Sequence, residues 1–241
     1  MLALCLLLFG VSLMSLQDSL IKLFAPHTSF WQLQLVRASF NMLFAVGLAA
    51  LAGGFHLLWP QRLWPALARG VLLAACMLCF FGVSQQITVA QMATGLYTYP
   101  LFITLFAGPV LGERIGPWRI GALVLGAAGC LLVLDPFADG GSYFQMVPVL
   151  AGFFYACNVL VLRRYCRTES PLALAFVVAL VFMLTGLGGA VGLEAFKAPA
   201  SWQQAVPFIF VGWPQLAIGM VGVFACFSAL NLIGNLLLSR A

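Results

Sequence analysis

Long apolar stretches alternate with short breaks of proline, glycine and charged residues along almost the whole chain. A helix that crosses the hydrocarbon core of a bilayer needs about 20 mostly apolar residues. By this measure the pattern predicts eight membrane-spanning helices, at residues 2–24, 30–52, 66–84, 90–111, 117–134, 145–162, 171–193 and 214–238. Pro26, Pro117 and Pro171 lie where one helix ends or the next begins. The sequence therefore predicts an all-α integral membrane protein, built as a polytopic helical bundle.

The composition excludes a water-soluble fold. Of the 241 residues, 63% are hydrophobic and 7% are charged, whereas a soluble domain has about 45 to 50% apolar and about 25% charged residues. The predicted helices leave room for short connections, so we expect no separate soluble catalytic domain. The longest connection, residues 194–213, contains Trp202 and Trp213, and we expect it to lie at the membrane interface, where indole rings are favoured.

Basic residues are distributed unevenly between the predicted loops. The loops after odd-numbered helices contain Lys197 alone. The loops after even-numbered helices contain eight of the eleven Lys and Arg residues, namely Arg62, Arg69, Arg114, Arg119, Arg163, Arg164, Arg167 and Arg240. Because loops rich in Lys and Arg remain in the cytoplasm, the pattern predicts that both termini are cytoplasmic, in a bacterial inner membrane. The net charge of +5 is scattered, so no nucleic-acid partner is expected.

The first predicted helix carries a polar face. Helical periodicity gathers on one side of it Ser12, Ser15, Ser19 and Lys22, with Asp18 beside them. Charges inside a span are candidates for a functional site, because hydrocarbon penalises each by about 2.5 to 3.5 kcal/mol on insertion scales. Arg37 in the second helix shares the depth of Asp18, roughly 9 to 10 Å from the exterior ends of the two helices. The pair can form a structural clamp or a gate that contacts substrate, and Lys22 can instead extend to water.

The charge balance of this group predicts a substrate preference. A cation within about 4 to 6 Å favours an ionised carboxylate, against the effect of burial. With Lys22 and Arg37 nearby, we expect Asp18 to stay ionised in a cluster of net charge about +1. Such a cluster favours a zwitterionic or anionic solute over an organic cation.

The predicted helix 90–111 combines polar side chains with a proline. Pro100 cannot donate a hydrogen bond to the carbonyl of Leu96, so the helix is expected to kink or open there. Candidate substrate-binding residues in this helix are Gln91, Thr94, Tyr97 and Tyr99. Further candidates in or beside the third, sixth and eighth helices are Gln85, Tyr155, Asn158 and Asn231. Each of them can line a cavity or form hydrogen bonds between helices.

Motifs for catalysis and metal binding are absent from the sequence. Lys22 and Lys197 follow apolar residues, so neither belongs to the Gly-Lys pair of a phosphate-binding loop. His27 and His56 are expected at opposite membrane faces, which leaves no metal cluster. We therefore expect no enzyme, no cofactor and no direct use of ATP.

Three segments resemble one known family: SLQDSLIKLF, LVRASF and TYPLFITLFAGPVLGERIGPWRIGALVLGAAGCLLV. They are similar to EamA-type transporters of the drug/metabolite transporter superfamily, and the similarity covers essentially the whole chain. The most specific element is the Leu-Gly-Glu-Arg turn that contains Gly112, Glu113 and Arg114. The resemblance implies a ten-helix inverted repeat of five plus five helices, with both termini cytoplasmic. It also implies a central cavity lined mainly by helices one, three, four, six, eight and nine.

The predicted repeats cover residues 1–134 and, in part, 145–241. A shift of 140 residues places Asp18 on Asn158 and Thr28 on Thr168, although apolar helices can also match by chance. The final GNLLLSRA resembles the cytoplasmic end of the family's eighth helix, which two more helices normally follow. Either the chain is truncated, or a partner or second copy supplies the missing wall.

Two functions follow from these patterns. The first is secondary transport of a small organic metabolite or drug-like solute across the bilayer by alternating access. The alternative is a non-transporting fragment or a subunit of a membrane assembly.

Overall fold

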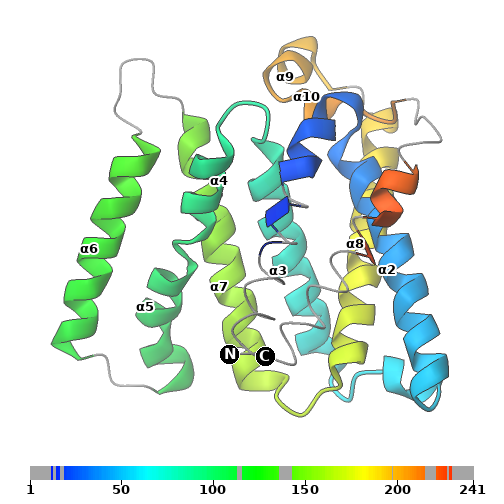
Figure 1. Ribbon diagram of the computed structural model, residues 1–241, viewed down its shortest axis with the longest axis horizontal. Coiled ribbons are helices and arrows are strands. Elements are labelled where there is room, and N and C mark those ends of the chain that lie inside the picture. The colour runs from blue at the N-terminus through cyan, green and yellow to red at the C-terminus, as the bar shows by residue number, and fades with distance from the viewer. Residues whose placement is uncertain are drawn as a thin grey trace. The chain divides into compact units, whose positions relative to one another are not determined.

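The fold was analysed in a computed structural model, which describes residues 12, 15–16, 19–112, 116–135, 143–196, 198–214, 221–226 and 228–229 (Figure 1). These residues form helices joined by short turns, and no strand occurs in this part of the chain. Six segments are long and apolar enough to cross a membrane: Phe30–Leu51, Leu63–Gly82, Val89–Leu111, Pro117–Leu134, Phe144–Tyr165 and Pro171–Ala195. They confirm six of the predicted spans. The predicted spans 2–24 and 214–238 fall largely outside the described residues.

The protein is thus an all-α polytopic membrane protein. Its contacts divide the chain into two compact units. We call Met1–Leu58 with Phe182–Ala241 the terminal unit, and Trp59–Val181 the central unit. The helix α8 (Pro171–Ala195) begins in the central unit and ends in the terminal unit. The predicted repeats, 1–134 and 145–241, are defined by similarity between two parts of the sequence. The division into units by contacts does not test this similarity, so the repeats stay a prediction.

In the central unit, one helix provides the packing centre. The elements are α3 (Leu63–Gly82), α4 (Val89–Leu96), α5 (Tyr99–Leu111), α6 (Pro117–Leu134), η3 (Tyr143–Met146) and α7 (Val147–Tyr165). The helix α7 packs against α3, α4 and α5 (Figure 1). Small residues allow this close approach: a Cβ added at Gly152 would lie 2.4 Å from the Thr98 hydroxyl and 2.8 Å from the Gly95 carbonyl oxygen.

The span Val89–Leu111 is broken in its middle, as Pro100 predicts. The helix α4 ends at Leu96, Tyr97 and Thr98 form the connection, and Pro100 lies in the first turn of α5. Proline is tolerated in a first helical turn, because the amide it lacks would have no partner there. At its other end, α5 stops at Gly112, which has a φ of 75° that favours glycine. Glu113 and Arg114 of the predicted turn lie outside the described residues.

Arg69 corrects the assignment of basic residues to loops. Arg69 lies inside α3, about 9 Å from its start at Leu63, and Arg119 lies in the first turn of α6. The predicted spans 66–84 and 117–134 already contain these two residues, so counting them with the loops was wrong. The start of α3 is stabilised from a distant loop: the Glu169 carboxylate accepts hydrogen bonds from the Gln61 and Arg62 amides, both at 2.8 Å. A cap supplied from more than 100 residues away leaves no local signal, so the sequence pattern placed the helix start too late.

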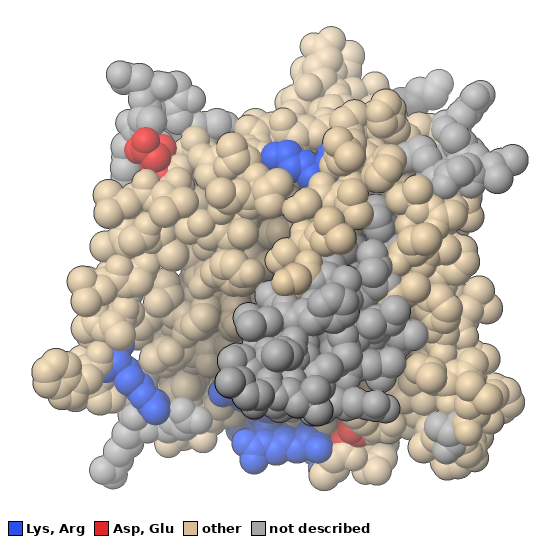
Figure 2. Space-filling model, in the orientation of Figure 1, with Lys and Arg blue, Asp and Glu red and all other residues tan. Residues whose placement is uncertain are grey.

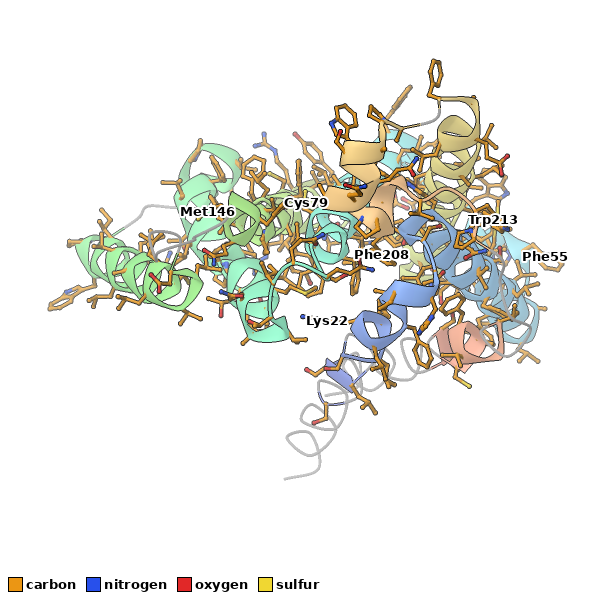
Figure 3. All side chains as sticks on the ribbon, turned by 90° about the horizontal axis from the view of Figure 1, so that it is seen from above. Lys22, Phe55, Cys79, Met146, Phe208 and Trp213 are labelled. Atoms are coloured by element: carbon orange, nitrogen blue, oxygen red, sulfur yellow. The ribbon has the colours of Figure 1, made fainter. Side chains whose placement is uncertain are left out.

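The terminal unit is organised around the start of α2. Its elements are η1 (Ala25–His27), α2 (Phe30–Ala52), η2 (Phe55–Leu58), the end of α8, α9 (Ala200–Ala205) and α10 (Pro207–Phe210). Phe208 is buried and its ring makes an edge contact with Phe30 at 6.1 Å between centroids (Figure 3). The Trp31 indole donates to the Ile209 carbonyl at 2.8 Å. These contacts fix α10 against α2.

The connection 194–213 contains the two short helices α9 and α10. Trp202 is 56% exposed and Trp213 is 45% exposed. Indole rings left open at the end of an apolar helix are typical of a membrane interface. Both rings are therefore accessible, and the interfacial position of this segment stays a prediction.

Candidate functional site

Polar side chains gather in the interior of the central unit, where α3 and α7 pack against each other. Arg69 lies on α3, and Tyr155 and Asn158 lie one turn apart on α7. The Arg69 guanidinium and the Tyr155 side chain are close enough to interact electrostatically. The Tyr155 ring makes an edge contact with the Tyr99 ring of α5, at 4.9 Å between centroids. We call Arg69, Tyr99, Tyr155 and Asn158 the α3–α7 polar cluster.

Two atoms of this cluster are buried without using their hydrogen-bonding capacity. Asn158 is 3% exposed and its Oδ1 has no partner among the described residues. The Nε of Arg69 is likewise buried without an acceptor in the described part of the chain. A buried polar group without a partner costs about 1 to 3 kcal/mol, so such groups are rare unless something else binds them. The cluster thus contains one buried acceptor and one buried cationic donor without partners among the described residues.

The aromatic members add a second kind of recognition. Tyr99 and Tyr155 are both half-buried, and their rings stand nearly perpendicular, at 74°. Aromatic rings in such an arrangement offer a face and an edge to a further planar ring. The cluster can therefore contact a solute that combines a planar ring with polar groups.

The sequence named three of these four residues as candidates; the Tyr99 and Tyr155 rings are in contact, and Asn158 lies one turn from Tyr155 on the same helix. Arg69 was missed because it was counted with the loop residues. The signal that would have found it is its position within an apolar helix, since ionisable residues in spans mark pathways for solutes.

Other candidates of the broken span make local contacts instead. Gln91 completes a capping box, in which its side chain accepts from the Thr88 amide at 3.0 Å. The Thr94 hydroxyl donates to the backbone carbonyl of Ala90 in the same helix, at 2.8 Å. Tyr97 is 60% exposed in the break. These contacts favour a structural role for Gln91 and Thr94.

Gln85 is exposed in the turn after α3. No contact with the α3–α7 polar cluster is described for it, and its role in binding stays a prediction.

The terminal unit contains a separate polar face on α2. Gln34 is 3% exposed, and its Nε2 has no hydrogen-bond partner among the described residues. Arg37 lies one turn further along the same helix, and its carbonyl accepts from the Ser228 hydroxyl at 3.2 Å. Lys22 is half-buried (Figure 3). Asp18 and Asn231 lie outside the described residues, so the Asp18 to Arg37 pair stays a prediction.

Metal ligands do not cluster in this part of the protein. No group of three or more His, Cys, Asp or Glu residues that could hold a metal ion occurs among the described residues. Charged side chains are few on the face drawn in Figure 2, and Lys and Arg gather at its lower edge.

Comparison with known families identifies the class of protein. The model of the EamA-like transporter family matches residues 1–135, which is more than half of the chain. The chain therefore belongs to the EamA-like transporter family.

Curated relatives carry several small molecules. A riboflavin transporter of Rhizobium johnstonii is 29% identical over 194 residues, which cover 79% of this chain and 61% of the relative. The pseudopaline exporter CntI of Pseudomonas aeruginosa is 28% identical over 73% of this chain and 56% of its own length. An S-adenosylmethionine uptake transporter of Rickettsia prowazekii is 25% identical over 65% of this chain and 52% of its own length. The chain thus spans about half to three fifths of these relatives.

A solved crystal structure of another protein supports the same fold. It superposes with a TM-score of 0.56 at 17% sequence identity, and the match covers 98% of this chain and 83% of that chain. At this identity the likeness shows the fold alone.

Proposed function

We propose that the protein is a secondary transporter that carries a small organic metabolite across the bacterial inner membrane by alternating access, without ATP. The observation that carries the proposal is the α3–α7 polar cluster, which buries unused hydrogen-bonding atoms between apolar helices. Membership of the EamA-like transporter family supports it. In many transporters the solute site lies near the bilayer midplane, beside a broken helix, and here the break between α4 and α5 lies next to α7.

The cluster also favours one class of solute. The Arg69 guanidinium suits a carboxylate, phosphate or other negatively charged group, and the Asn158 oxygen accepts from an N–H or O–H donor. Tyr99 and Tyr155 suit a planar ring. A heteroaromatic solute that is zwitterionic or anionic fits these groups better than an organic cation. Riboflavin and S-adenosylmethionine, named for two of the relatives, both contain a planar heteroaromatic ring, which supports the preference for a ring but not the preference for a negative charge.

The test is uptake and binding by the purified protein in proteoliposomes. Riboflavin, S-adenosylmethionine and an aromatic amino acid form the panel, and each is measured with a proton gradient, with a membrane potential and without either. We expect saturable movement of one class of solute that is unchanged by ATP. Because the chain spans only part of its relatives, equilibrium binding is measured on the same samples.

Two variants distinguish a loss of solute binding from a general effect of removing a positive charge. Arg69→Gln should weaken binding about tenfold or more, because it removes a charge-assisted contact with the solute. Arg119→Gln removes a positive charge from the start of α6 and should leave binding unchanged. Binding that is equal in the wild type and in Arg69→Gln would contradict the assignment of the site. A protein that neither binds nor moves any member of the panel would favour a non-transporting role in a membrane assembly.

The orientation is part of the proposal. A reporter fused after Arg167 should be active in the cytoplasm, and one placed at Gly140 should be active outside. The opposite pattern would overturn the cytoplasmic placement of both termini.

A further inference from the structure

A cavity of about 500 Å³ lies in the central unit, where α5 and α7 end. Its walls come from two segments. One is the last turn of α5, Pro109–Gly112, and the other carries the arginines 163, 164 and 167 at and just after the end of α7. None of the described lining residues is acidic. Figure 2 shows basic side chains at the lower edge of the drawn face, with an acidic side chain beside them.

Part of this arginine cluster already has a structural role. The last carbonyl groups of a helix lack partners within the helix, and basic residues can bind them. Arg164 donates through Nη1 to the Val110 carbonyl, and its guanidinium lies over the Tyr165 ring, 5.4 Å from the centroid. Arg167 donates through Nε to the Arg163 carbonyl. Arg164 therefore fixes the end of α5 to the end of α7.

The remaining donors exceed this structural need. A guanidinium carries five N–H donors in a fixed plane. The two hydrogen bonds just described use one donor of Arg164 and one donor of Arg167. Among the described lining residues, the cavity is thus lined by a local excess of positive charge and of N–H groups.

We propose that this cavity binds a phosphate group. Guanidinium groups bind phosphate oxygens in pairs, with a geometry that an ammonium group does not reproduce. The cavity also lies where two apolar spans end, which is the depth of lipid headgroups. The phosphate can come from an anionic phospholipid or from a soluble phosphate compound, and the experiment separates these sources.

The first arm measures lipid binding. Native mass spectrometry of the detergent-purified protein is used to titrate phosphatidylglycerol and, separately, phosphatidylcholine. We expect phosphatidylglycerol to bind at lower concentration. The double variant Arg163→Gln with Arg167→Gln should weaken this binding about tenfold or more, because each basic residue beside an anionic headgroup contributes measurably to affinity. Arg164 is left intact because it holds α5.

The second arm uses inorganic phosphate and calorimetry on the same proteins. Phosphate binding that the double variant abolishes, without selective lipid binding, assigns the cavity to a soluble phosphate compound. If neither probe binds the wild type selectively, or if the double variant binds both as the wild type does, the proposal is wrong.

Two further variants keep the result independent of folding. Arg119→Gln removes one charge from the start of α6, outside the cavity lining, and should bind phosphatidylglycerol as the wild type does. Arg163→Lys with Arg167→Lys retains the charge and removes the planar donors, so we expect binding several-fold weaker than wild type. If the glutamine variant does not fold, equal binding by this lysine variant and the wild type overturns the proposal.

Discussion

The start of α2 and the α3–α7 polar cluster both bury polar side chains within apolar spans, but they use them differently. At the start of α2, Gln32 is fully buried, and its Nε2 donates to the Pro214 carbonyl at 2.9 Å. Its Oε1 accepts from the Thr28 hydroxyl at 3.0 Å, and its backbone N–H donates to the Ser29 hydroxyl. In the cluster, the Asn158 Oδ1 and the Arg69 Nε have no such partners among the described residues.

This difference separates two roles that burial alone does not distinguish. A buried polar side chain with complete hydrogen bonds holds the fold together, and its removal leaves other groups unpaired. A buried side chain with unused atoms contributes little to the fold, so its presence calls for another explanation. Gln32 belongs to the first kind and Asn158 to the second. Substitution of Gln32 should therefore lower stability, whereas substitution of Asn158 should weaken binding.

The largest effect on stability is expected at Glu169, where a buried carboxylate has complete hydrogen bonds. Glu169 is 7% exposed and accepts from two amides that precede α3. Glu169→Ala should lower the free energy of unfolding by about 3 kcal/mol, because both amides lose a charged acceptor. Thermal unfolding in detergent provides the measurement. Glu169→Gln keeps one acceptor oxygen and should lose less; alanine and wild-type proteins of equal stability would contradict this role.

A matched pair of leucine variants compares the two places directly. Asn158→Leu should reduce solute binding about tenfold or more and change the free energy of unfolding by less than about 1 kcal/mol, since the group removed has an unused oxygen. Gln32→Leu should lower that free energy by about 2 kcal/mol, because the Pro214 carbonyl and the Thr28 hydroxyl lose their partner.

Both variants are measured by thermal unfolding and by equilibrium binding of the solute that the transport panel selects. If Asn158→Leu and Gln32→Leu lose equal stability, the two residues do not differ in structural role. Loss of binding in Gln32→Leu alone would transfer the site to the terminal unit.

A smaller effect is expected at Gln91, which the sequence alone nominated for substrate binding. Its capping box with Thr88 predicts that Gln91→Ala lowers the free energy of unfolding by about 1 kcal/mol and leaves solute binding unchanged. Thr88→Ala is the matched control and should behave alike, because both residues serve the same cap. If Gln91→Ala weakens binding and Thr88→Ala does not, Gln91 contacts the solute after all.

The apolar pattern predicted the spans well because the length of a membrane helix is set by the bilayer. It also predicted the break of the fourth span, since the effect of Pro100 is local. Hydrogen-bond partners far apart in sequence could not be predicted in this way. Glu169, whose carboxylate caps the start of α3, lies 107 and 108 positions from the residues whose amides donate to it, and Trp31 lies 178 positions from Ile209.

The same limit applies to the site. Polarity within a span nominated Tyr99, Tyr155 and Asn158 together with Gln91 and Thr94. Only the side-chain contacts separate those with local partners from those with unused atoms. The paired charges expected around Asp18 stay a prediction, because that residue lies outside the described part of the chain.

The smallest effect is expected from Cys166, which lies just after α7, near both Arg69 and Glu169. It is 2% exposed, and burial raises the pKa of its thiol. The Arg69 guanidinium opposes this rise in the pKa, the Glu169 carboxylate adds to it and the Arg62 guanidinium opposes it, and the net direction stays upward. An unfolded chain releases this proton near its ordinary value of about 8.5. Above that pH the unfolded state therefore binds fewer protons than the folded state, and stability falls as pH rises.

The measurement compares thermal unfolding of the wild type and of Cys166→Ala at about pH 7 and about pH 9.5, on either side of the ordinary thiol value. The stability of the wild type relative to the variant should decrease at the higher pH, because the variant has no thiol to titrate at this position. The other cysteines are present in both proteins, so their contribution is removed by the comparison. A relative stability that increases with pH would show that the nearby guanidinium groups of Arg69 and Arg62, rather than burial, dominate the pKa of the thiol.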